Sequence, residues 1–378
     1  MNAWPCVAGV VAAALALSAP VALADQSTPP AAAPAVHADS PAPVTTVPEP
    51  ATVFAVPPAL RTALLQWVGN ARTQDVRLQR LVEFMHAEDG LRMEYAHDAT
   101  STVGDAYLTR KANCLTFTLL TVALARELGL QAYGQEIDQV LSWYQQDNTI
   151  YRSNHVNAGV RVRAHRLTVD VASTAVIVRH MPKPVDDAHL LAMFYNNRAV
   201  ELSARHQPQV AAAHMAMSLR LSPAYAANRS NAGVLHLREG DLAAAERDYL
   251  AALVLDPDFH PALINLVSVY EHTGNRARLA AYRARLERVQ RRDPFHHFLA
   301  AMAHERRGEY ALAAERYRKA IRLHRDEYRF HLALARVYLH LGDARRAGNA
   351  LRQARRLDQD DRNHVLYQAK LDLLRRPR

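Results

Sequence analysis

The second half of the sequence repeats itself every 34 residues, and this period constrains the fold more than any other feature of the chain. Four glycines mark it, at equal intervals: Gly240, Gly274, Gly308 and Gly342. An alanine or leucine stands five residues after each glycine and another stands twelve residues after it. A helix, a turn at the glycine and a second helix with a small residue at the point of closest approach explain this pattern. Because one helical pair cannot bury its apolar face alone, we expect the pairs to stack into an all-α superhelix.

One further period fits upstream, with His206 in the glycine column. The sequence therefore predicts five repeats over about Ala192 to Gln359, followed by an amphipathic capping helix at Arg362 to Leu374. The repeat resembles the tetratricopeptide repeat (TPR) family in its best-matching columns, which are Gly233, Gly240, Ala245, Tyr249 and Pro257. The resemblance implies a concave surface that holds a protein or peptide partner.

The chain is basic, with a formal net charge of +9 and a pI near 9.7. Seven of its arginines lie between Arg276 and Arg292, inside the third repeat. Two interpretations stay open: a groove for an acidic partner, or a solvated helix face, which such runs more often are. Aromatic residues that could stack nucleobases do not interleave with these arginines, so we expect no nucleic-acid partner.

The N-terminal residues predict export. The apolar run Val7 to Leu23 ends in Ala22-Leu23-Ala24, which is typical of a signal peptide spanning residues 1–24 and of a periplasmic or secreted protein. No basic residue precedes Arg61, so an uncleaved short anchor stays open as an alternative. Residues 25–58 are rich in proline and alanine, which predicts an extended, mobile linker. No later run reaches the roughly 20 apolar residues of a spanning helix, so we expect no stable membrane span after cleavage.

Cys114 is the residue that any chemistry of this chain has to explain. The sequence has two cysteines, and Cys6 would leave with the signal peptide. Asn113 is a good N-cap for the apolar helix that follows and ends at Gly129, so Cys114 stands in the first helical turn. There the helix dipole and free backbone N–H groups favour the thiolate. We assign residues 59–190 to the domain that carries Cys114 and residues 191–378 to the repeats.

Around Cys114 the pattern predicts helix over Leu60 to Met93 and strands at Gln131–Val140, Asn154–Val162 and Leu167–Val171. The last two strands form a hairpin, with His155 on one and Asp170 on the other. A nucleophile, a base and an orienting carboxylate thus follow one another along the chain. A turn centred on Ala164-His165 would leave Asp170 about 13 Å along the strand from His155, whereas a turn shifted toward residues 161–164, or a bulge, would bring them together.

These segments resemble the transglutaminase-like cysteine enzymes, through Asn113-Cys114 and its helix, Asn154-His155-Val156 and Thr168-Val169-Asp170. The resemblance implies a papain/transglutaminase-like α+β domain with Cys114 as nucleophile, His155 as general base and Asp170 as the group that orients His155. It also implies acyl transfer through a thioester, with hydrolysis of an amide or peptide bond and cross-linking both open. No metal-ligand cluster or phosphate-binding glycine loop appears, so we expect no metal and no cofactor.

Two functions of different class follow. The first is an exported cysteine-dependent acyl-transfer enzyme whose TPR repeats recruit a protein or peptide substrate. The alternative is a non-catalytic TPR scaffold of the bacterial envelope with a degenerate transglutaminase-like domain.

Overall fold

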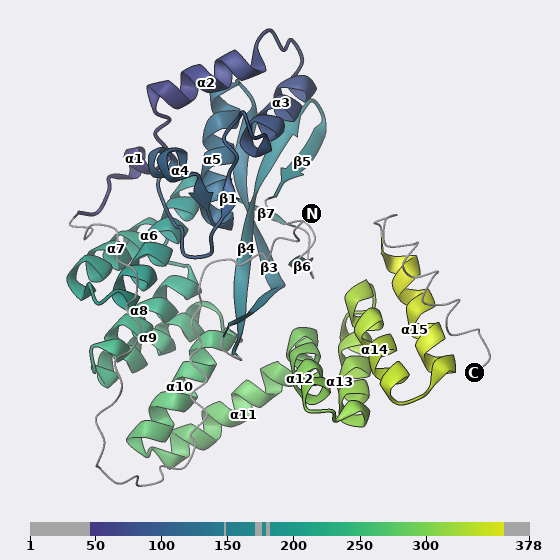
Figure 1. Cartoon of the computed structure of the whole chain (residues 1–378). Coiled ribbons are helices and arrows are strands. Elements are labelled where there is room, and N and C mark those ends of the chain that lie inside the picture. Colours follow the sequence, from purple (N-terminus) through teal and green to yellow (C-terminus); the bar gives the residue numbers. More distant parts are fainter. Residues whose placement is uncertain (1–45, 147–148, 171–175, 179–181, 359–378) are drawn as a thin grey trace, which may run out of the picture.

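The computed structural model describes residues 46–146, 149–170, 176–178 and 182–358 (Figure 1). The expected signal peptide and the expected capping helix lie outside these ranges. An α+β part comes first along the chain and a run of paired helices follows it. Within the described ranges, no helix is both long enough and apolar enough to cross a membrane.

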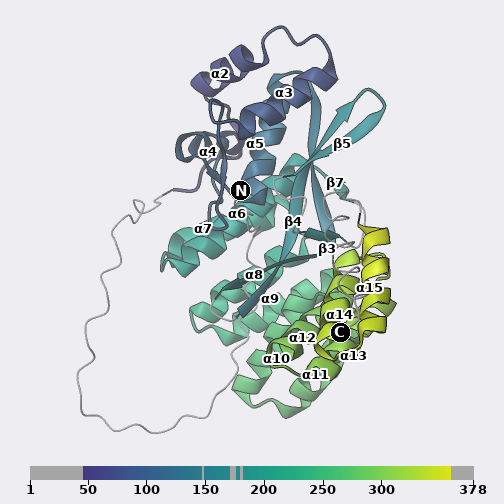
Figure 2. The ribbon, with the colours of Figure 1, turned by 45° about the vertical axis from the view of Figure 1, so that its right-hand side comes forward.

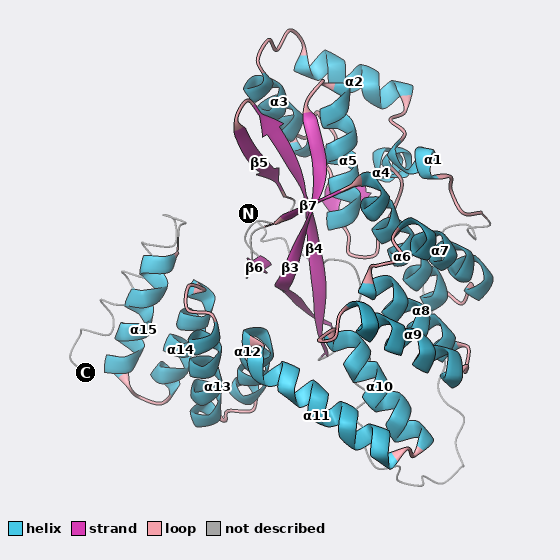
Figure 3. Ribbon diagram, turned by 180° about the vertical axis from the view of Figure 1, so that it is seen from behind, coloured by secondary structure: helices cyan, strands magenta, loops and turns pink. Residues whose placement is uncertain are grey.

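The α+β part is built around helix α5 (Cys114–Glu127), whose side chains are buried on every side from Cys114 to Ala125. A helix that is apolar all round has to be enclosed. Strands β3 and β4 lie along one side of it, and α2, α3 and α4 lie around the rest (Figures 1 and 3). The elements are α1 (Pro50–Phe54), α2 (Pro58–Val68), α3 (Gln74–His86), β1 (Glu94–Tyr95), α4 (Val103–Thr109), β2 (Lys111–Ala112), β3 (Gln131–Gln146), β4 (Thr149–Val162), β5 (His165–Val169), β6 (Val176–Val178) and β7 (Lys183–Val185).

The main sheet is antiparallel, with strand order β5-β4-β3-β6 and with β7 also paired to β3. The three strands expected from the sequence are present, and β3 and β4 extend beyond their expected ends at Val140 and Asn154. The helical stretch expected over Leu60 to Met93 is two helices, α2 and α3. The break comes at Gly69, which takes a φ of +54° that a side chain disfavours, and Thr73 then caps α3.

The extended linker expected over residues 25–58 does not hold for its last part, residues 46–58. Pro50 starts the short helix α1, and Val53 within it is completely buried. The Tyr195 hydroxyl donates a hydrogen bond to the Pro48 carbonyl at 2.7 Å. The composition suggested a linker, but four apolar side chains here (Val47, Val53, Phe54 and Val56) pack in or against the core of the α+β part.

In the described part of the second half, up to residue 358, the chain forms five helical pairs, as the 34-residue period predicts. They are α6 (Asp187–Ala204) with α7 (Pro208–Leu221), α8 (Ala226–Arg238) with α9 (Leu242–Leu255), α10 (His260–Thr273) with α11 (Arg276–Arg292), α12 (Pro294–Arg306) with α13 (Tyr310–Leu323), and α14 (Tyr328–His340) with α15 (Ala344–Leu357). The four repeat glycines lie in the turns within the pairs and all have positive φ, between 69° and 83°. His206, which replaces glycine in the first pair, has a φ of +58°.

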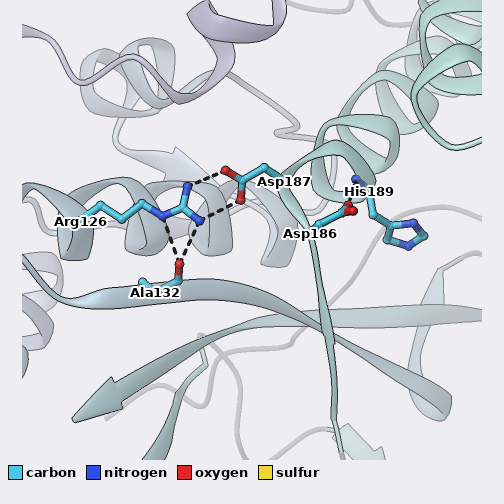
Figure 4. A network of polar contacts seen from close by, with 5 residues as sticks. All are labelled: Arg126, Ala132, Asp186, Asp187 and His189. Carbon is cyan, nitrogen blue, oxygen red and sulfur yellow. Dashed lines mark hydrogen bonds and ion pairs between the residues drawn. The ribbon is translucent and has the colours of Figure 1, made fainter. Parts of the chain in front are cut away.

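Helix α6 belongs to both halves, so the expected boundary between residues 190 and 191 falls inside it. Leu190 packs so closely over Gly134 of β3 that an added Cβ would come within 2.6 Å of it. At the start of α6 the Asp187 carboxylate accepts two bonds from the Arg126 guanidinium, at 2.6 and 2.8 Å, and the same guanidinium donates to the Ala132 carbonyl (Figure 4). These contacts join the end of α5, the start of β3 and the first repeat.

The array changes direction near α11. Of all junctions between consecutive helices of the array, the one between α11 and α12 has the sparsest contacts. Figures 1 and 3 show α6–α9 beside the sheet and α12–α15 on the opposite side of α10 and α11. In Figure 2, α2 and α3 lie at the end of the α+β part farthest from the array.

Candidate active site

Cys114 is the first residue of α5, as the sequence predicts, and a buried cap holds it there. The Asn113 side chain accepts a hydrogen bond from the Thr116 backbone N–H at 2.9 Å, which satisfies one free donor of the helix start. Its amide donates to the Thr100 hydroxyl at 2.7 Å. Since Asn113 is fully buried, these two bonds fix the direction in which α5 begins.

His155 and Asp170 come together because of the register of the β4–β5 hairpin. Val162 pairs with His165 and Ala158 pairs with Val169, so the turn is Arg163-Ala164. The next position along β5, Asp170, therefore falls opposite Asn157, and His155 lies two residues further on the same face of β4. Diagonal neighbours at this spacing are within side-chain reach. The Nε2 atom of His155 lies 2.7 Å from Oδ2 of Asp170.

A distant helix holds this turn. Arg163 takes a φ of +54°, which a tight hairpin of this length requires at its first position. The Arg163 backbone N–H donates to the Gln74 side chain at 3.0 Å, and its guanidinium lies 3.2 Å from the Asp75 carboxylate. Both partners stand in the first turn of α3. These contacts hold the turn at the position that lets Asp170 meet His155.

The environment of His155 favours its charged form. Its side chain is 2% exposed, and burial by itself lowers the pKa of an imidazole. Hydrogen bonds to Asp170 and to Cys114, together with the charge of both partners, outweigh burial and raise the pKa of His155 to about 10. Asp170 and His155 are thus in direct contact, and Cys114 is among the groups that raise the pKa of His155; we call these three predicted residues the cluster.

The thiol itself has little access to solvent. Cys114 is a free cysteine and only 3% exposed. The Thr118 hydroxyl lies 2.8 Å from the Cys114 carbonyl and 3.2 Å from the Val156 carbonyl, so it joins the first turn of α5 to β4 next to His155. The Thr118 hydrogen bonds therefore fix α5 and β4 relative to each other at the cluster, and the thiol is buried.

Two residues near the cluster were missed in the sequence. The Asn157 amide donates to Oδ2 of Asp170 at 3.1 Å, so this carboxylate oxygen is held by two side chains of β4. The two-residue period of a strand, which places Asn157 on the face of His155, would have found it. Glu201 of α6 could not have been found in this way. Burial raises the pKa of Glu201 to about 7, although Arg198, at 2.9 Å, and Thr100 lower it, and the Thr100 hydroxyl accepts from the Asn113 cap.

Among the described residues, no group of three or more histidine, cysteine, aspartate or glutamate side chains is placed to hold a metal ion. The arginine-rich stretch of the third repeat is helix α11. Three of its arginines pair with nearby carboxylates: Arg278 with Glu246, Arg283 with Glu271 and Arg291 with Glu287. These pairs favour the solvated-face interpretation over the anionic groove.

Comparison with known proteins bears on the helical pairs. A family model described as "Tetratricopeptide repeat" matches residues 306–371. No curated protein matches the chain. Similar solved structures include YrrB, titled a TPR protein with an unusual peptide-binding site, at 17% identity and a TM-score of 0.25 over 47% of this chain and 92% of that one. They also include PilF of Pseudomonas aeruginosa (13%, TM-score 0.27, 50% and 90%) and TTC0263 of Thermus thermophilus (19%, TM-score 0.26, 48% and 98%). From the family match and the five helical pairs, the second half of the chain is a TPR array.

Proposed function

We propose that this protein is a scaffold whose TPR array binds a protein or peptide partner. The observation that carries the proposal is the array itself, five stacked helical pairs, the last of which lies within the family match. Stacked repeats of this kind present extended surfaces built from many helices, which suit an elongated protein partner. The α+β part anchors the array through α6. The sequence analysis favoured an acyl-transfer enzyme. The family match covers only repeat residues, and it supports a binding function instead.

A second candidate, acyl transfer by a cysteine nucleophile, is supported by one specific observation. Nε2 of His155 lies 2.7 Å from the Asp170 carboxylate, and Asp170 and Cys114 both raise the pKa of His155. In such a reaction the proton of the pair rests on His155, as its raised pKa favours, and the Cys114 sulfur attacks the acyl carbon of an amide as the thiolate. The proton then leaves with the amine, and a thioester remains on Cys114. Water or a second amine would release the acyl group, and the Cys114 backbone N–H at the start of α5 would bind the developing oxyanion.

The two candidates make opposite predictions about Cys114. Because the thiol is 3% exposed, the enzyme needs its cover to move before an acyl carbon can arrive, whereas the scaffold has no such need. We would expose the full chain to an iodoacetamide probe and quantify labelling of Cys114 by peptide mass spectrometry. For the enzyme, labelling falls strongly in His155→Ala but not in His165→Ala, a matched change of an exposed histidine at the start of β5. Labelling that is negligible, or equal in both variants, supports the scaffold alone.

Partner retention tests binding directly. Proteins cross-linked to the wild type, to Cys114→Ala and to Gly308→Val would be compared from the same host extract. Valine at Gly308 opposes a φ of +75° and disturbs the turn of the fourth pair. A scaffold keeps the same partners in Cys114→Ala and loses them in Gly308→Val. Partners that accumulate only in Cys114→Ala are uncleaved substrates and indicate the enzyme. Equal retention in all three variants contradicts a role for the array.

A further inference from the structure

A groove of about 650 Å³ crosses the last repeat, between α13 and α15, with α14 beneath it. Its floor is apolar and includes Ile321, Leu334 and Ala350. Five arginines line it: Arg318, Arg322, Arg346, Arg352 and Arg356. None of the described residues that line it is an aspartate or a glutamate. The groove is far in sequence from the arginine run of α11, and the sequence did not single it out.

Three of these arginines differ from Arg278, Arg283 and Arg291 of α11, which pair with carboxylates. Arg346 is used internally, since it pairs with Asp343 at 2.5 Å and lies over the Tyr338 ring at 4.8 Å. Arg318, Arg322 and Arg356 are exposed, and in the part of the chain that the structure describes no ion pair joins them to a carboxylate. Three cations without internal partners around an apolar floor are complementary to a ligand that carries both acidic and apolar groups.

We propose that this groove binds an acidic amphipathic peptide segment, with an apolar side chain on the floor and carboxylates against Arg318, Arg322 and Arg356. The inference rests on the proposed binding function and gives it a place and a partner chemistry. A nucleic acid fits less well, because stacking needs a free aromatic face and the Tyr338 ring is already covered by Arg346. The chain's own C-terminal residues 362–378 fit less well too, since they hold five lysines and arginines and one aspartate.

Fluorescence anisotropy on the full chain tests the groove. The probe is a fluorescein-labelled helical peptide with leucines on one face and glutamates on the other, and its control carries glutamine in place of glutamate. We expect Arg318→Gln/Arg322→Gln to weaken binding of the glutamate peptide by about tenfold at low salt. The matched control is Arg288→Gln/Arg292→Gln, which removes two exposed arginines from α11 and should change the affinity by less than about twofold. Ile321→Gln, at the rim of the floor, should also weaken binding without any change in charge.

Several results would overturn the inference. An equal loss of affinity in Arg318→Gln/Arg322→Gln and in Arg288→Gln/Arg292→Gln means that net charge alone attracts the peptide. Equal affinity for the glutamine peptide removes the role of the carboxylates. Tighter binding of labelled single-stranded DNA, sensitive to the same two substitutions, makes the groove a nucleic-acid site. Tighter peptide binding after deletion of residues 362–378 makes the chain's own terminus the occupant. Partner retention in Cys114→Ala together with loss in Gly308→Val would still support the scaffold in each case, so failure of the groove and failure of the proposed function are distinguishable.

Discussion

The charge on Asp170 is the property of the candidate site that a single substitution isolates. Asp170→Asn keeps the size of the side chain and its hydrogen bond to His155 but removes the negative charge beside the ring. In the wild type, His155 has its pKa raised from 6.5 to about 10, and Asp170 is the first of the causes that raise it. Without that charge, the lowering of the His155 pKa by burial is no longer outweighed to the same extent. We therefore expect the pKa of His155 to fall by several units in the variant.

The sign of the effect on stability follows from linkage. A group whose pKa is raised on folding contributes stability that is fully present below its unfolded value and is lost as the pH rises through the folded value. For His155 this window runs from about 6.5 to about 10. At about 1.4 kcal/mol per unit the shift corresponds to at most about 5 kcal/mol. Since Cys114 supplies part of it, we expect Asp170→Asn to cost about 2–3 kcal/mol more at pH 6 than at pH 10.

Urea denaturation of the wild type and the variant at a series of pH values measures this difference. Asn157→Ala serves as a control, because it removes a hydrogen bond from an uncharged amide to the same carboxylate oxygen and should cost a nearly constant amount of about 1.5–3 kcal/mol between pH 6 and pH 10. A cost of Asp170→Asn that does not change with pH would refute the reasoning. Asp170 would then be a hydrogen-bond acceptor that closes the hairpin, and the case for a charge-coupled triad would fail with it.

Three further substitutions test local stability, one at the cap beside Cys114 and two in the repeats. Asn113→Ala removes the buried cap of α5 and should lower the free energy of unfolding by about 1–2 kcal/mol in urea denaturation; no change would mean that Thr100 and Thr116 bind elsewhere. His206→Gly relieves the positive φ of the first repeat and should raise the melting temperature by a few degrees, about 0.5–1 kcal/mol, whereas a lower melting temperature would show that the histidine side chain is needed. Gly233→Ala places a Cβ within 2.6 Å of the Tyr249 ring and should cost about 1–3 kcal/mol, relieved in the double variant with Tyr249→Leu; calorimetry of the three chains decides it.

The helices and strands near the candidate site were readable from the sequence because each depends on local signals. Asn113 caps α5 and places Cys114 in its first turn, as the residue types alone predict. The alternation around His155 and before Asp170 gave the two strands of the hairpin. The break at Gly69 and the packing of Val53 were not readable, because one depends on where the chain must turn and the other on a surface built by distant residues.

The distance between His155 and Asp170 was beyond the sequence. It depends on the register of one hairpin: a turn one residue later, at Ala164-His165, would place Asp170 opposite Gly159 and separate the pair. Gln74 and Asp75, about ninety residues earlier, hold Arg163 at the turn that brings the pair together. No local pattern encodes a contact of that kind.

By itself the sequence determined the five helical pairs. Each 34-residue period has glycine and small residues at the same positions, so each pair folds in the same way and buries its apolar face against its neighbours. It also determined the types of the three residues at the candidate site and the elements that carry them. The tertiary structure alone decided that His155 and Asp170 meet, that Cys114 is buried, and that α6 joins the array to the core around it. Helix caps and the repeat pattern depend on residues close together in the sequence. The hairpin register, the burial of Cys114 and the packing of α6 depend on contacts between residues far apart in the chain.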